Sequence, residues 1–211
     1  VDYPDRTIIS HHVMPEGFYD RIELDKTILP KVLVYSGFIV FGLMPALCLK
    51  IIKRDILEKA IINVLDSIKI GEDVATTLYC LSFAQSLSIL RTSAYHYVQS
   101  EGSMTRGFNA NRLKDICAIF ECISKIDNDK IQKQIAMYIS CLVFYAVAEA
   151  VLKSGYSYKQ LKIYLLSILK HEMVVNCLKA VDTSNLSIKE KMKIFFMRHK
   201  MVCALKVFIK G

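Results

Sequence analysis

The spacing of apolar residues changes along the chain, and the first hundred residues alternate short apolar runs with helical patterns. The run "RTIISHHVM" is rich in β-branched residues and predicts a short strand, and "DSIKI" predicts a compact strand that ends at Gly71. From Asp73 onward, Val74, Leu78 and Leu81 recur at i, i+4 and i+7, the spacing of one helical face. "LSILRTSAYHYVQ" then predicts one or two further short strands. Strands and helices in this order indicate an α/β layer.

One apolar segment raises the question of a membrane span. Residues 32–49, "VLVYSGFIVFGLMPALCL", contain no charge, and their length is at the lower limit for a transmembrane helix. Two glycines and a proline interrupt the segment, and a lysine bounds each end. A buried strand followed by a turn explains the same pattern, because the central strands of a sheet are continuously apolar. We therefore interpret the segment as part of the core.

The second half of the chain has a helical pattern throughout. "NRLKDICAIFECISKI" carries an apolar stripe, and "DNDKIQKQIAMYISCLVFYAVAEAVLKSG" predicts a long helix that is apolar nearly all round and is expected to lie between other helices. Its end at Gly155 suits a helix stop. Ser157 with Gln160 and Ser187 with Glu190 fit capping boxes at two further helix starts. We expect about four helices joined by short turns.

Composition narrows the class of protein. Of 211 residues, 53% are hydrophobic, which favours a folded chain with a large core. The formal net charge of +8 favours anionic partners, but no RNA- or DNA-reading motif is present, so nucleic acid is not expected as a partner. The seven cysteines form no CxxC pair, which predicts buried free thiols in a reducing compartment, by default the cytoplasm. The first residues lack the pattern of a signal peptide and include no initiator Met, so we interpret the chain as a piece of a longer protein.

The candidate chemistry is concentrated in Glu72 and Asp73, which follow Gly71 where a helix is expected to begin. Two interpretations stay open. An acidic side chain at a helix start can accept hydrogen bonds from unpaired backbone N–H groups and meets the positive end of the helix dipole, which contributes about 1 kcal/mol and implies no function. Alternatively, a carboxylate at the C-terminal end of a strand lies where α/β sheets place ligands, and it could take a proton from a hydroxyl group.

Several residues around this pair form an ordered set. In chain order, the set is Pro45, Lys50, Lys53-Arg54, Asp66, Gly71-Glu72-Asp73, Tyr95-His96-Tyr97 and Ser103-Met104-Thr105. Together with the upstream stretch "EGFYDRIELDKTILPKVL", it resembles the second half of family-2 glycosyltransferases, the inverting GT-A enzymes that build bacterial capsules, teichoic acids and related surface glycans. The resemblance implies an α/β, mostly helical fold: the acceptor-side half of a GT-A-like sheet domain over residues 1–107, followed by a helical extension over residues 108–211.

The resemblance also implies a mechanism and a set of site residues. Asp73 would act as the general base that deprotonates an acceptor hydroxyl as it attacks the anomeric carbon of a nucleotide sugar, and Glu72 would orient the loop. His96, Ser103 and Arg106 would bind the donor diphosphate, although a strand position for His96 and a solvated charge for Arg106 explain these residues equally well. A divalent metal, Mg²⁺ or Mn²⁺, is expected on an Asp-x-Asp motif in a preceding donor-binding half. The fragment alone is therefore expected to bind no metal and to transfer no sugar.

Two further stretches bear on this expectation. "DND", residues 127–129, matches Asp-x-Asp but lies between two predicted helices, where a helix cap explains it better. Residues 187–211 are predicted as one basic amphipathic helix with seven Lys or Arg residues, one acidic residue and several aromatic side chains. Such a helix fits an anionic membrane surface, where a lipid-linked acceptor would reside, but a packed helix with solvated lysines fits as well.

These observations define two functional hypotheses. The first is a cytoplasmic enzyme, peripheral on the inner membrane face, that transfers a sugar from a nucleotide sugar to a glycan or lipid-linked acceptor in surface polysaccharide synthesis. The alternative is a non-catalytic helical module that binds a membrane or a partner protein. The identity of Asp73 as a base separates the two, so the surroundings of this carboxylate decide which hypothesis the molecule favours.

Overall fold

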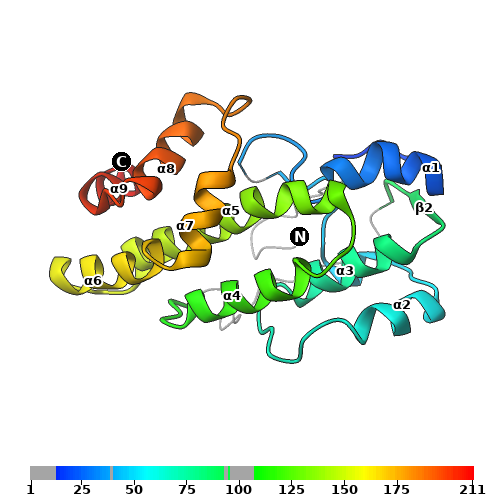
Figure 1. Ribbon diagram of the computed structural model, residues 1–211, viewed down its shortest axis with the longest axis horizontal. Helices are drawn as coiled ribbons and strands as arrows, with labels where there is room; N and C mark the ends of the chain where they lie inside the picture. The colour runs from blue at the N-terminus through cyan, green and yellow to red at the C-terminus, as the bar shows by residue number, and fades with distance from the viewer. Residues whose placement is uncertain (1–12, 39, 93–94, 96–106) are drawn as a thin grey trace.

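A computed structural model of the chain describes residues 13–38, 40–92, 95 and 107–211, and these are mostly helical (Figure 1). The longer helices, in chain order, are α2 (Arg54–Ile61), α3 (Glu72–Phe83), α4 (Arg112–Ile123), α5 (Asp129–Lys153), α6 (Tyr158–Leu169), α7 (Glu172–Ala180), α8 (Ile188–Arg198) and α9 (Val202–Lys210). The remaining elements are the strands β1 (Gly17–Asp20) and β2 (Ser86–Ile89), the short helix α1 (Arg21–Glu23), the π-helical turn η1 (Leu24–Ile28) and the 3₁₀ turns η2 (Leu29–Lys31) and η3 (Leu47–Leu49).

The sheet is much smaller than the sequence pattern predicts. Within the described residues it consists of β1 and β2, paired antiparallel with Gly17 opposite Ile89. The prediction of a strand at "DSIKI" was wrong: these residues form turns, and the N–H of Ile68 donates to the carbonyl of Leu65 at 3.1 Å instead of to a neighbouring strand. Most of "RTIISHHVM" lies outside the described residues. The mostly helical class is therefore confirmed, whereas the larger GT-A-like sheet is not part of the described fold.

The described residues of the apolar segment 32–49 form an irregular loop that ends in η3, and not a strand or a long helix. Val32, Leu33, Phe38 and Leu43 are buried in the core, which confirms the interpretation of this segment as core. Its backbone is held by side chains. The side-chain oxygen of Gln134 accepts hydrogen bonds from the N–H groups of Leu33 and Val34 at 3.0 and 3.1 Å. The N–H of Phe38 donates to Glu190 at 2.6 Å. Because polar side chains from α5 and α8 satisfy these N–H groups, the segment needs no neighbouring strand.

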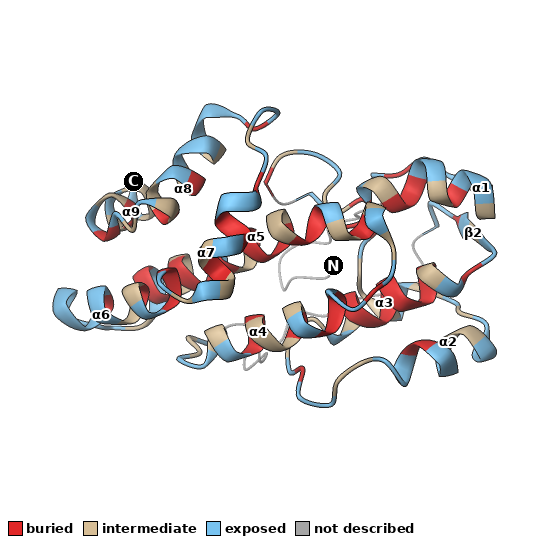
Figure 2. Ribbon diagram, in the orientation of Figure 1, coloured by how far each residue is buried: buried red, intermediate tan, exposed pale blue. Residues whose placement is uncertain are grey.

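Helix α5 runs through the centre of the molecule, as its apolar pattern predicted, and contacts helices α4, α6, α7, α8 and α9 (Figure 1). Its start confirms the cap predicted at residues 127–129, because the Asn128 side chain accepts hydrogen bonds from the N–H groups of Lys130 and Ile131. By length and composition α5 could cross a membrane, but 61% of its apolar window is buried inside the molecule. Figure 2 shows this contrast with the outer helices, whose surfaces are largely exposed. The same properties belong to a helix at the centre of a folded core.

The C-terminal region contains more helices than the sequence predicted. Both capping boxes, at Ser157 and Ser187, are present as predicted. However, six helices, and not about four, occupy the described residues from 107 onward. The stretch predicted as one basic helix is divided into α8 and α9 by Lys200, which adopts a left-handed conformation with φ of 53°. The two helices therefore fold back on each other as a hairpin.

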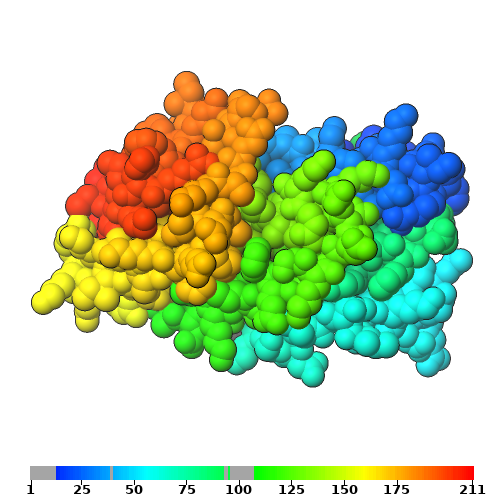
Figure 3. Space-filling model, in the orientation of Figure 1, coloured from blue at the N-terminus to red at the C-terminus, as the bar shows by residue number. Residues whose placement is uncertain are grey.

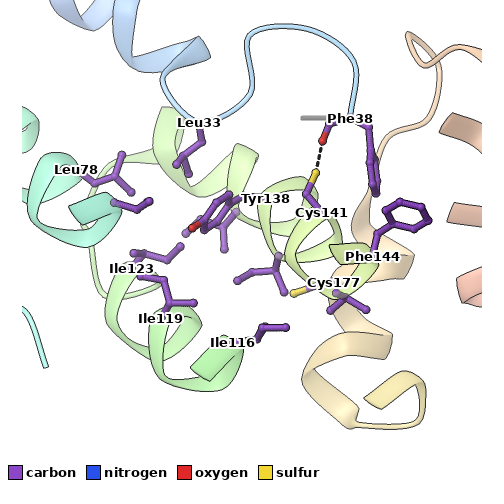
Figure 4. Close-up of a cluster of buried hydrophobic side chains, with 14 of the residues drawn as sticks. Leu33, Phe38, Leu78, Ile116, Ile119, Ile123, Tyr138, Cys141, Phe144 and Cys177 are labelled. Carbon is purple, nitrogen blue, oxygen red and sulfur yellow. Dashed lines mark hydrogen bonds between the residues drawn. The ribbon is translucent and has the colours of Figure 1, made fainter. Parts of the chain in front are cut away.

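The core joins both halves of the chain in one apolar cluster. Figure 4 shows Leu78 of α3, Ile119 of α4 and Tyr138 of α5 meeting near Leu33 of the irregular loop. The seven cysteines are all free, as predicted, but Cys48 and Cys203 are exposed and not buried as expected. The proposed boundary between residues 107 and 108 stays a prediction.

Candidate functional site

The start of α3 is fixed by a glycine in a conformation that other residues avoid. Gly71 has a φ of 95°, in the left-handed region, and is the N-cap of the helix. A Cβ atom at this position would lie 3.3 Å from the side chain of Ile119 and 3.7 Å from the hydroxyl of Tyr138. Gly71 thus allows the helix start to pack closely against α4 and α5. This packing sets the position of the two carboxylates that follow.

Neither carboxylate caps the helix through a hydrogen bond. Glu72 is exposed and Asp73 is half-buried. The N-cap residue, Gly71, has no side chain, and within the described part of the chain neither carboxylate accepts a hydrogen bond from a main-chain amide. Of the capping interpretation, only the interaction of the negative charges with the helix dipole remains. The Asp73 oxygens are therefore not engaged by the main chain of the described residues.

A lysine from a distant segment lies near Asp73. The ammonium group of Lys50 is half-buried and donates hydrogen bonds to the carbonyls of Ala46, at 2.9 Å, and Met44. Burial lowers the pKa of Lys50 to about 8, and the negative charge of Asp73 partly opposes this decrease. The two groups interact through their charges, without a direct ion pair between them.

The segment that carries Lys50 is attached to α3. The hydroxyl of Thr77 on α3 donates a hydrogen bond to the carbonyl of Pro45 at 2.8 Å, and the turn η3 then leads to Lys50. The thiol of Cys80, one turn farther along α3, also lies in this environment: burial raises its pKa and the charge of Lys50 lowers it. The fold thus brings two parts of the ordered sequence set, residues 45–50 and 71–73, to one place.

Glu72 has a different environment from its neighbour. It faces solvent, and its charge is the smallest of three influences that raise the pKa of Tyr138, after burial and the charge of Cys141. The charge of Glu72 therefore acts on the Tyr138 hydroxyl at the start of α3. The role of Glu72 in orienting the loop stays a prediction.

The other predicted site residues follow α3 in the sequence, before α4. His96, Ser103 and Arg106 lie outside the described residues. Of the other residues in the ordered set, Asp66 lies in an exposed turn and Tyr95 is half-exposed. The described residues include no group of three or more His, Cys, Asp or Glu side chains that could hold a metal ion. The divalent metal expected in the complete enzyme stays a prediction.

Lys50 is the residue whose importance the sequence pattern understated. It belongs to the ordered set, but its charge was given no role. A signal was present, because Lys50 lies between the apolar runs "ALCL" and "II", where a lysine must lose part of its hydration on folding. A lysine kept in such a position at a cost in stability is typical of a functional site.

Comparison with known proteins identified no relative of this chain. No protein-family model matches the chain, and neither does any curated protein or solved structure. The resemblance to family-2 glycosyltransferases therefore rests on the residues quoted above, and the geometry around Asp73 is an independent observation beside it.

Proposed function

We propose that this chain is the acceptor-side part of an inverting glycosyltransferase of the GT-A type, in which Asp73 is the general base. The observation that carries the proposal is the environment of Asp73. Its carboxylate is half-buried at a helix start, is not used by main-chain amides of the described residues, and lies near the partly buried cation of Lys50. Both residues belong to the ordered set that resembles this family, although 22 intervening positions separate them in the sequence.

The proposed reaction is a single displacement. A carboxylate oxygen of Asp73 takes the proton of an acceptor hydroxyl, and the hydroxyl oxygen forms a bond to the anomeric carbon of the sugar. The bond between that carbon and the phosphate oxygen breaks, and the nucleoside diphosphate leaves with the electron pair. The configuration at the anomeric carbon is inverted because attack and departure occur on opposite faces.

Lys50 is assigned a positioning role in this proposal. Its ammonium group is fixed by carbonyls of the loop before it and attracts the Asp73 carboxylate through charge. Such an arrangement holds a carboxylate in one orientation toward an incoming hydroxyl, which lowers the entropy cost of proton transfer. Glu72, which is exposed, would support the loop and not touch the reacting atoms.

The proposal requires parts that the described residues do not supply. A donor-binding half with a parallel sheet must bind the nucleotide sugar, and charged groups must stabilise the leaving diphosphate. His96, Ser103 and Arg106 stay candidates for the diphosphate contacts. For this reason the activity must be measured with the protein expressed from the whole gene.

The test is transfer from a panel of nucleotide sugars to lipid-linked and glycan acceptors. We expect Asp73→Asn to lower turnover by about 10²- to 10⁴-fold with little change in donor affinity, because the substitution removes a positioned base. The matched control is Asp55→Asn, which changes an exposed aspartate in the first turn of α2. Equal turnover by wild type and Asp73→Asn, or no transfer by the wild type from any donor, would contradict the proposal.

The non-catalytic alternative is favoured by a separate feature, the exposed apolar surface of α8 and α9. The two hypotheses differ in their consequences. A membrane-binding module without activity would bind vesicles and give no transfer with any donor, whereas the enzyme would lose transfer on substitution of Asp73.

A further inference from the structure

Helix α8 carries apolar side chains on two opposite sides. On the inner side, Ile194 and Met197 are completely buried against the rest of the molecule. On the outer side, Ile188 and Phe195 are 78% and 51% exposed, and Met192 is also exposed. At about 100° per residue, these three outer residues form one stripe that lies roughly opposite the buried side. A helix that only packs on a core does not need this second stripe.

The outer stripe continues onto α9. Met192 and Phe196 of α8 line an open groove of about 370 Å³ together with Val207 and Phe208 of α9. Val207 is 73% exposed. The hairpin at Lys200 thus places the outer apolar residues of both helices on one surface, which we call the α8–α9 surface. Figure 3 shows these helices at one end of the molecule, beside α6 and at the opposite end from α1.

Positive charge borders this surface. Lys189 and Lys191, on either side of the outer stripe, are exposed. On α9, Lys206 and Lys210 line a second groove with Val207, and the Lys206 ammonium lies 5.4 Å from the centre of the Tyr158 ring. The long side chains of these lysines can cover apolar surface while their charged groups point outward.

The single acidic residue of this region faces inward. Glu190 accepts hydrogen bonds from Ser187, at 2.8 Å, and from Phe38, at 2.6 Å. Burial alone would raise the pKa of Glu190, but these hydrogen bonds and the charge of Lys193 lower it overall. The carboxylate is therefore ionised and used within the fold. Within residues 187–211, no acidic side chain is left to oppose the lysines at the outer surface.

We propose that the α8–α9 surface binds an anionic phospholipid bilayer. The exposed apolar stripe would enter the boundary between head groups and acyl chains, and the bordering lysines would contact the head groups. A second copy of the chain is a poorer occupant, because it would bring two strongly basic surfaces together. This inference does not depend on the proposed enzymatic activity.

The test is flotation of the 211-residue chain with lipid vesicles under reducing conditions. We expect binding to vesicles of equal parts phosphatidylcholine and phosphatidylglycerol, weak binding to phosphatidylcholine alone, and loss of binding in high salt. The double substitution Lys189→Gln and Lys191→Gln should weaken binding by about 30-fold, since each basic residue at an anionic surface contributes about 5-fold. Lys59→Gln, an exposed lysine on α2, is the charge control.

A second pair of variants tests the apolar contribution. Ile188→Ser with Val207→Ser should weaken binding by at least about 10-fold, because two inserted side chains are lost. Ile22→Ser is the matched control, since Ile22 is 75% exposed on α1 at the other end of the molecule. All four substituted side chains are exposed on the folded chain, so the variants are expected to unfold at the same denaturant concentration as the wild type.

Three results would overturn the proposal. One is absence of flotation with the anionic vesicles. Another is binding that both double variants retain at wild-type strength. The third is concentration-dependent dimer formation in the absence of lipid that Ile188→Ser with Val207→Ser abolishes, because the surface would then be an interface between copies. None of these results bears on glycosyl transfer, so the two proposals can fail separately.

Discussion

The starts of α3 and α8 both carry acidic residues, but the two helices use them differently. At α8, Ser187 and Glu190 form a complete capping box, and Glu190 also binds the N–H of Phe38 across the molecule. At α3, the N-cap is Gly71, and Glu72 and Asp73 accept no hydrogen bond from main-chain amides of the described residues. The comparison separates a structural carboxylate, whose oxygens accept hydrogen bonds from main-chain amides, from two carboxylates whose oxygens no main-chain amide of the described residues engages.

The largest expected effect on stability concerns the structural carboxylate. Glu190→Ala should lower the free energy of unfolding by about 3 kcal/mol, because it removes a cap and leaves the Phe38 N–H without its partner. Asp73→Ala should change it by less than about 1 kcal/mol, because only the interaction with the helix dipole is lost. Urea unfolding at neutral pH measures both values. Equal losses for the two variants would show that Asp73 is also structural.

The next effect concerns the glycine that positions Asp73. Gly71→Ala should lower the free energy of unfolding by about 2 kcal/mol. The left-handed conformation is unfavourable for alanine, and the added Cβ would lie only 3.3 Å from the Ile119 side chain. Gly155 provides the control: its φ is also positive, at 67°, but no atom lies within 4 Å of a Cβ there. A smaller loss for Gly155→Ala than for Gly71→Ala, measured by urea unfolding, would show that the close packing at α3 contributes beyond backbone conformation.

A smaller change in the free energy of unfolding is expected with pH, and it arises from Lys50. Its pKa of about 8 in the folded chain is below the ordinary value of 10.5, so between these pH values the unfolded chain binds a proton that the folded chain does not. Stability should therefore rise as pH increases through this window, and below it the folded chain carries the full cost of burying the charge. We expect about 1–2 kcal/mol after allowing for partial solvent screening. In Lys50→Met this rise should disappear, whereas a rise of equal size in both proteins would exclude Lys50 as its source.

The smallest expected loss of stability concerns the capping box of α6, where the side chains of Ser157 and Gln160 hydrogen-bond within the box and to no other described residue. Ser157→Ala should lower the free energy of unfolding by about 1 kcal/mol, the usual value of a lost N-cap. Ser187→Ala should cost more, because Ser187 also orients the carboxylate that binds Phe38. Thermal unfolding of the two variants measures the difference, and the reverse order would show that the link between α8 and the loop contributes little.

Much of the helical part of the fold could be predicted from local patterns. The apolar spacing identified α3, α4 and α5, and both capping boxes occurred where the sequence placed them. These features depend on residues within three or four positions of one another, so both partners of each interaction lie in one short stretch of sequence. The residue types at the start of α3 likewise indicated where the candidate chemistry lies.

Other features depended on contacts between distant residues. The loop at residues 32–49 looked like a strand because its apolar content is continuous, but Gln134 and Glu190, about a hundred or more positions away, supply its hydrogen bonds. The break between α8 and α9 at Lys200 could not be predicted from the sequence either, because no glycine or proline lies there. It coincides with Arg198 binding the carbonyls of Leu178 and Val181 at the end of α7, a contact that exists only in the folded chain.

The sequence by itself determined the helical pattern, the basic charge of the C-terminal region and the identity of the two carboxylates. Only the tertiary structure decided that Asp73 is not used for capping by the described main chain, that Lys50 lies near it, and that the apolar residues of α8 and α9 share one outer surface. The physical reason is the range of the interactions. Helix formation and capping act between near neighbours in sequence, whereas burial and charge interactions depend on which distant segments the fold brings together.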